Sequence, residues 1–332
     1  MTAPEEEPRL PASSAALAYG LRAAWQRWAL VVGIFLLNLA WAFACTLPVY
    51  LRLSRATALR PFAAPLSRGL HLDVLYEVAA RSPGLLTDAL GALLLGAAGW
   101  VVVSWFLTAG VLGVLQIPAS SLRLRRFAAL AAARGFAMAR IQAWSWLLYA
   151  VTLGVLAGGG YLGGWVGSRA VNPWVMIAAA AAAALPGVLL TLVVTTAVDA
   201  ARAVAATGEE RAMWRVLLGA LRLVWRQPRR LLGVQVWGGL LILVAGAVYL
   251  ALAWPAAYAG PAAFVGLMLL REVAVLARTG LRVATLAGML HIIAAAAPAS
   301  SRAAGAALEP GGPPEPLDST PKRRAVLLEL DV

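Results

Sequence analysis

The sequence predicts an all-α polytopic membrane bundle of about six transmembrane helices with amphipathic lead-in helices on the cytoplasmic side. Three observations support this fold class. The chain is 61% hydrophobic and 13% charged with a mean hydropathy of +0.79, whereas a soluble domain has roughly a quarter of its residues charged. Six apolar runs reach or approach the about 20 residues that a helix needs to cross a bilayer. Most basic residues lie in alternate connections between those runs.

The sixth apolar run is the weakest of the predicted spans. Arg271 and Glu272 interrupt it, so it is alternatively a helix that lies partly in the membrane interface. The other five contain no comparable pair of charges. The six runs cover residues 28–51, 85–117, 141–167, 173–198, 231–254 and 261–281.

The distribution of charge predicts the orientation. One side of the membrane receives the N-terminus, 117–140, 199–230 and everything from Arg271 onward, which together hold 22 of the 28 Lys and Arg residues. Positive residues concentrate in cytoplasmic connections, so both termini are predicted to be cytoplasmic. The net charge of +13 then faces anionic lipid headgroups and not nucleic acid.

The N-terminus favours a retained first span over a cleaved signal. It carries Glu5, Glu6 and Glu7 where a secretory signal carries basic residues, and its first apolar run is too long for a signal. Abundant Ala, Arg, Leu and Gly with almost no Lys is typical of a GC-rich bacterial genome, which predicts the bacterial inner membrane. Cys45 is the only cysteine, so no internal disulfide or cysteine-based metal site is expected.

The chain divides into a disordered N-terminus over 1–13, a transmembrane domain over 14–297 and a disordered tail over 298–332. Within the domain, 14–28 has an amphipathic stripe, and its segment 20–27 resembles 219–226, with a looser copy at 124–140. We infer three helical hairpins, each with a lead-in helix. Alternatively, any span that enters from a basic cytoplasm has this pattern.

Two further segments carry structural predictions. Gly159, Gly163 and Gly167 recur every four residues, which predicts close packing against the alanine run 178–184 of the next span. Pro186 is expected to kink that span. The sizeable extracytoplasmic connection, 52–84, includes a possible short helix over 70–80 and is either a place for an external ligand or a solvated connector.

The candidate functional residues are Arg271, Arg278 and Arg282. At 100° per residue they share one helix stripe, and Arg271 lies about 15 Å along from Pro261, at membrane depth. We expect Arg271 to face the bundle interior. The favoured interpretation of the stripe is that Arg278 and Arg282 snorkel to the interface and Arg271 pairs with an acid. Alternatively, the stripe contacts an anionic substrate or lipid headgroup.

Asp199 is the candidate ion-pair partner of this stripe. It lies at the cytoplasmic end of the fourth span, at about the depth of Arg278. It could equally pair with Arg202, three residues on. Asp88, near the outer end of the second span, is another possible acid.

No catalytic, cofactor-binding or metal-ligating residue is predicted. His71 and His291 are expected on opposite sides of the membrane, which excludes a site that needs both. Gly158–Gly160 lacks the Lys-Ser/Thr of a nucleotide loop, and no serine elbow occurs.

Asp199-Ala200-Ala201-Arg202 and the segment 217–228, with Arg222 and Arg226, resemble a family of uncharacterised six-helix bacterial membrane proteins. These are similar to the membrane domain that accompanies some glycerophosphodiester phosphodiesterases. The resemblance implies a membrane-embedded chain with a cytoplasmic helical linker between the fourth and fifth spans. The catalytic phosphodiesterase domain is absent, so the resemblance implies no activity.

We therefore expect a non-enzymatic accessory, scaffold or lipid-associated component whose partners are membrane lipids and possibly another membrane protein. The alternative is a transporter or permease-type subunit for an anionic or lipid-like substrate. A transporter should contain discontinuous helices and a polar cavity at the midplane. A scaffold should have a filled bundle and a large docking face.

Overall fold

The computed structural model describes residues 11–57, 84–117, 124–169, 172–207, 212–256 and 261–296. This part of the chain folds into eight α-helices and contains no strand, as the sequence predicted. The helix proposed for 70–80 and the disorder proposed for 1–10 and 298–332 lie outside the described residues. Residues 11 and 12 have no regular structure, and the first helix begins at Ser13.

Six helices are long and apolar enough to cross a bilayer, so the chain is a multi-pass membrane protein. The last of them, which carries Arg271 and Glu272, meets this criterion with the others. All but α5 are longer than their apolar runs because residues that flank the run continue the helix, whereas α5 ends two residues before its run does. The six are α2 (Trp28–Thr57), α5 (Leu85–Leu115), α6 (Leu124–Gly167), α7 (Pro173–Thr207), α9 (Pro228–Ala256) and α10 (Pro261–Ala296).

The two short helices, α1 (Ser13–Gln26) and α8 (Met213–Arg226), are equivalent to each other. Each has 14 residues and is followed by a single non-helical residue before a long helix begins. That residue has φ −116° and ψ 34° at Arg27, and φ −128° and ψ 53° at Gln227. The exposed Trp25 and Trp225 occupy matching positions, with 81% and 82% of their surface accessible.

The buried faces of α1 and α8 match as well. Ala16, Leu17, Gly20 and Ala24 of α1 correspond in order to Val216, Leu217, Ala220 and Val224 of α8. The segment 124–140, in contrast, is not a separate lead-in helix. It continues into the third span as one unbroken 44-residue helix, α6. Of the three predicted lead-in helices, two are therefore separate and one is fused.

The long helices form three hairpins in which α2 contacts α5, α6 contacts α7, and α9 contacts α10. The first part of α6 contacts α5, where Phe127 and Leu130 lie over Gly110 and Gly113. In the same way α8 contacts α7, and α1 contacts α10. Each lead-in segment thus packs on the second helix of the hairpin before it, and the first lead-in packs on the last hairpin. The three units form a closed ring.

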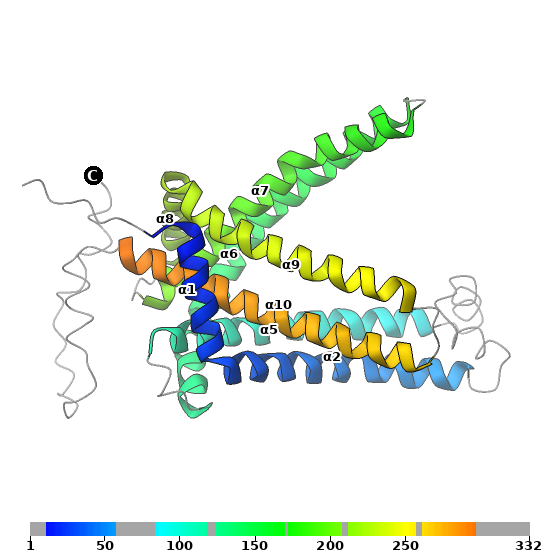
Figure 1. The fold of residues 1–332 in the computed structure, drawn as a ribbon, viewed down its shortest axis with the longest axis horizontal. Coiled ribbons are helices and arrows are strands. Elements are labelled where there is room, and N and C mark those ends of the chain that lie inside the picture. The colour runs from blue at the N-terminus through cyan, green and yellow to red at the C-terminus, as the bar shows by residue number, and fades with distance from the viewer. Residues whose placement is uncertain are drawn as a thin grey trace, which may run out of the picture.

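Burial is concentrated at one end of this ring, which we call the closed end. Its buried core includes Ala109–Val114 of α5, 194–206 of α7 and 283–290 of α10, together with the inner faces of α1 and α8. At the opposite, open end the hairpins diverge, and the α6–α7 hairpin points away from α2, α5 and α10 (Figure 1). Large apolar side chains are exposed there, as a lipid-facing surface requires.

The predicted contact between the third and fourth spans is confirmed. A Cβ atom on Gly163 would lie 2.8 Å from the Cα of Ala180, and one on Gly159 would overlap the carbonyl of Ala183. Gly160 and Gly164 have nothing within 4 Å of a Cβ position, so only one of the two glycine stripes is in the contact. Pro186 lies inside α7, whose helix runs unbroken through it.

Candidate functional site

The three arginines of α10 have two different environments. Arg282 lies at the edge of the closed end, next to the buried segment that starts at Val283. Arg278 and Arg271 lie one and three turns further toward the open end, where the side chains of α10 are more exposed. The shared stripe predicted from sequence is therefore divided between two sites.

Arg282 belongs to a buried ion cluster centred on Asp199 of α7, whose side chain is 1% exposed. Arg282 approaches both carboxylate oxygens: Nη1 is 2.5 Å from Oδ2 and Nη2 is 2.5 Å from Oδ1. Arg202 adds a third bond, with Nη1 at 3.1 Å from Oδ1. The other terminal nitrogen of Arg202 donates to Oε1 of Gln142 on α6. The cluster links α6, α7 and α10.

Asp199 therefore pairs with Arg282, and the local pair with Arg202 is also formed. Asp199 lies at the level of Arg282 along the membrane normal, and not at the level of Arg278 as expected. The two residues meet where α7 and α10 contact each other at the closed end. A bidentate arginine contact is among the strongest ways to satisfy a buried carboxylate. With two guanidinium groups on one carboxylate, the cluster has an excess of one positive charge, and the acid has no free oxygen for proton transfer.

Arg271 and Arg278 line a groove of about 220 Å³ between α9 and α10. The α9 wall contains Ile242, Gly246 and Tyr249, so the groove has apolar sides and two basic groups on one edge. Contrary to what the sequence had led us to expect, Arg271 does not face the bundle interior. It is exposed and lines the groove. Figure 1 shows the α6–α7 hairpin pointing away from α10 toward the open end, where several side chains of α10 are exposed.

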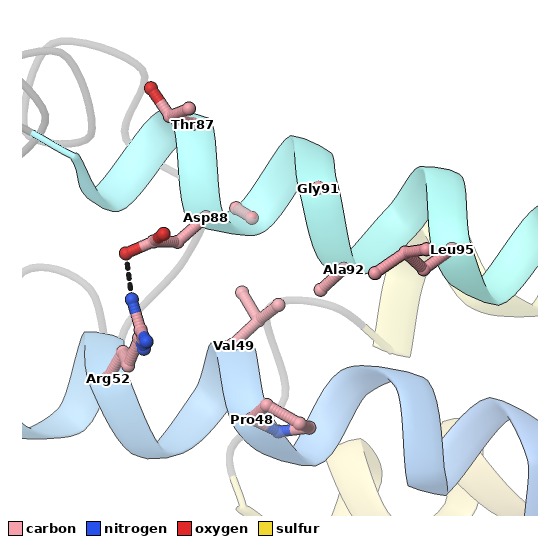
Figure 2. Close-up of a pocket in the computed structure, with 9 residues that line it drawn as sticks. Pro48, Val49, Arg52, Thr87, Asp88, Gly91, Ala92 and Leu95 are labelled. Atoms are coloured by element: carbon pink, nitrogen blue, oxygen red, sulfur yellow. Dashed lines mark hydrogen bonds and ion pairs between the residues drawn. The ribbon is translucent and has the colours of Figure 1, made fainter.

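A second hollow, of about 300 Å³, lies between α2 and α5 at the open end. Figure 2 shows Arg52 and Asp88 facing each other across the two helices, with Val49 and Ala92 beside them. Asp88 forms an ion pair with Arg52. It is thus engaged within its own hairpin and does not pair with the arginines of α10.

Sequence reasoning missed Arg27, the residue between α1 and α2. It is 8% exposed and donates from Nη2 to the carbonyl oxygen of Ile117, 2.7 Å away, just beyond the end of α5. This contact gives a partner to a backbone carbonyl group that follows the helix, and it attaches the first unit to the end of α5. The sequence shows only a basic residue at the junction of two helices. It does not indicate that the partner of Arg27 is a carbonyl group 90 residues away.

The remaining singled-out residues have structural surroundings. His291 of α10 stacks on Tyr19 of α1 with ring centroids 4.2 Å apart. Cys45 of α2 packs against Gly96 of α5. His71 lies outside the described residues, and within them no three His, Cys, Asp or Glu side chains gather as metal ligands.

Comparisons with known proteins indicate no function for this chain. No family model, no curated protein and no solved structure matches the chain. The resemblance of 199–202 and 217–228 to the membrane domain of phosphodiesterases therefore stays a prediction. In the structure, Asp199 and Arg202 form part of the ion cluster, and the segment 217–228 includes most of α8.

Proposed function

We propose that this protein is a non-catalytic, lipid-associated scaffold component of a bacterial inner membrane. The observation that carries the proposal is the contrast between the two ends of the molecule. The closed end has a buried core in which the helices pack on one another, whereas the open end exposes large apolar side chains that lipid or a membrane protein partner could contact. Asp199 supports the non-catalytic reading, because its carboxylate is held by Arg282 and Arg202.

The two equivalent short helices support lipid association. Trp25 and Trp225 are exposed on α1 and α8, and Arg22 is exposed beside Trp25. Indole rings prefer the level of the headgroups, and basic groups prefer an anionic membrane surface. Helices with an apolar buried face and this exposed pattern lie in the plane of the interface.

The proposal puts the closed end on the cytoplasmic side, because 22 of the 28 Lys and Arg residues belong to segments on that side. In a variant with Cys45→Ala, a membrane-impermeant thiol reagent added from outside should label Ser67→Cys and leave Gly208→Cys unlabelled in intact cells. Lysis should expose both. Labelling of Gly208→Cys alone in intact cells would reverse the orientation.

Lipid association is tested by the lipids that co-purify with the protein. After extraction in a mild detergent from membranes of phosphatidylethanolamine and phosphatidylglycerol, the retained lipid should be enriched in phosphatidylglycerol over its share of the membrane. An unrelated six-span protein of neutral charge, extracted in the same way, is the control. Retained lipid of the same composition as the membrane would contradict the proposal.

A transporter for an anionic or lipid-like substrate is the second candidate, and the groove with Arg271 and Arg278 at membrane depth is what favours it. The unbroken helices α7 and α10 favour the scaffold instead, because transporters commonly interrupt helices at their binding site. Vesicles with fluorescent phosphatidylglycerol and the protein should lose fluorescence to external dithionite no faster than protein-free vesicles. Faster and more complete loss would support the transporter.

A further inference from the structure

We propose that the groove between α9 and α10 is a binding site for one anionic phospholipid, with its headgroup phosphate at Arg271 and Arg278 and an acyl chain along α9. This inference rests on the proposed lipid association and names the ligand and its site. It starts from the two arginines, which line the same groove. Neither forms a hydrogen bond or ion pair with another residue of the described part of the chain.

The depth of these two residues makes their lack of a protein partner costly. The level of α1 marks the interface, and α1 crosses α10 where Gly20 contacts Ala284. At a rise of about 1.5 Å per residue, Arg278 lies about 9 Å and Arg271 about 20 Å from that level. The hydrocarbon core is about 30 Å thick. Both arginines therefore belong to its depth, where an unpaired charge is expensive.

The acids of the bundle do not neutralise these charges. Asp199 is held by Arg282 and Arg202, and Asp88 is paired with Arg52. Glu272 follows Arg271 directly, but consecutive helix residues point about 100° apart, and no ion pair joins it to either arginine among the described residues. The negative partner of the groove therefore comes from outside these acids.

The shape and lining of the groove fit a phospholipid. Its volume of about 220 Å³ and the apolar residues Ile242 and Val275 suit an acyl segment beside a small anionic group. Tyr249 lines the same groove and brings a hydroxyl group. Guanidinium groups bind phosphate through charge-assisted hydrogen bonds. A lipid of the adjacent leaflet carries both an acyl chain for the apolar wall and an anionic phosphate, whereas a free anion has no apolar part for that wall.

The glycine at the centre of the α9 wall provides a way to fill the groove. Gly246 lines it, and a Cβ atom there would meet nothing within 4 Å. Gly246→Leu therefore places an apolar side chain in the groove without a clash in the protein. Gly154→Leu on α6 is the matched control, because Gly154 also has nothing within 4 Å and does not line the groove.

The charge variants have a matched control as well. Arg271→Gln with Arg278→Gln removes the two groove charges, and Arg271→Lys keeps the charge but loses the planar fork. Arg125→Gln with Arg126→Gln removes two positive charges from exposed sites at the start of α6, away from the groove. It thus reports how much of the binding depends on general attraction to an anionic lipid.

The experiment is native mass spectrometry of the full chain titrated with phosphatidylglycerol and, separately, with phosphatidylcholine. Wild type should hold one phosphatidylglycerol tightly. The affinity should fall by about tenfold or more in the double glutamine variant and in Gly246→Leu, because charge-assisted hydrogen bonds or the acyl space are lost. Arg271→Lys should lose less. The double variant of Arg125 and Arg126 and Gly154→Leu should stay within about twofold of wild type, a change of under about 0.5 kcal/mol.

Three results would overturn the groove assignment. One is that wild type and both groove variants bind phosphatidylglycerol equally well. If wild type then still prefers this lipid over phosphatidylcholine, the proposed lipid association is retained and only the groove assignment fails. Another is an equal loss in the controls. The third is displacement of the lipid by millimolar inorganic phosphate, which would identify a free anion as the ligand. If wild type shows no preference between the two lipids, the proposed lipid association itself fails.

Discussion

The closed and open ends of this molecule are made of the same six helices, yet they are stabilised in different ways. At the closed end, α7 and α10 lie against each other and bury Asp199, which is paired with Arg282 and Arg202, and α1 and α8 pack on these helices. At the open end, contacts remain within hairpins, as between Arg52 and Asp88 or between α6 and α7. The buried interactions between hairpins thus lie at the closed end, and under the proposed function the open end accommodates lipid or a partner.

The largest loss of stability is expected when the carboxylate at the centre of the ion cluster is removed. Asp199→Asn leaves Arg282 and Arg202 without a counter-charge. Loss of one partner from a buried pair costs about 3–5 kcal/mol, and because the Arg282 side chain is 41% exposed, we expect the lower end of that range. The free energy of unfolding, measured by denaturing detergent titration, should fall by that order. A change as small as that of Asp88→Asn would mean that the cluster does not hold the closed end together.

An intermediate effect is expected where the hairpin α6–α7 is tightest. Gly163→Leu forces a side chain against Ala180, whose Cα would be 2.8 Å from the new Cβ. Overpacking of this kind costs about 1–3 kcal/mol. Gly164→Leu is the control, since nothing lies within 4 Å of its Cβ position. If the two variants have the same melting temperature in detergent, the contact between the two helices is not as close as described.

The smallest effect is expected at the open end. Arg52 and Asp88 are paired, but their side chains are 57% and 48% exposed. Exposed pairs contribute up to about 1 kcal/mol, so Arg52→Gln should lower the free energy of unfolding by less than that. The measurement is the same detergent titration as for Asp199→Asn. A loss as large as at Asp199 would show that the open end is held as firmly as the closed end.

The sequence alone determined the class of this protein, its six spans and the close contact of α6 with α7. These features depend on local composition and periodicity: apolar length sets a span, and glycines every four residues remove side chains from one helix face. The equivalence of α1 and α8 was also visible, in the shared pattern of Leu21, Arg22 and Trp25 with Leu221, Arg222 and Trp225. The matching buried faces of the two helices, which the sequence does not show, establish this equivalence.

Tertiary structure decided which charges meet. Arg271, Arg278 and Arg282 share one stripe in the sequence, but only Arg282 lies where α7 and α10 approach each other, so it alone takes Asp199. Arg271 was expected inside a bundle, and the divergence of the hairpins leaves it on a groove. Periodicity fixes the face of a helix on which a residue lies, whereas its partner depends on how far the neighbouring helix is at that height. That distance is set by contacts remote in sequence.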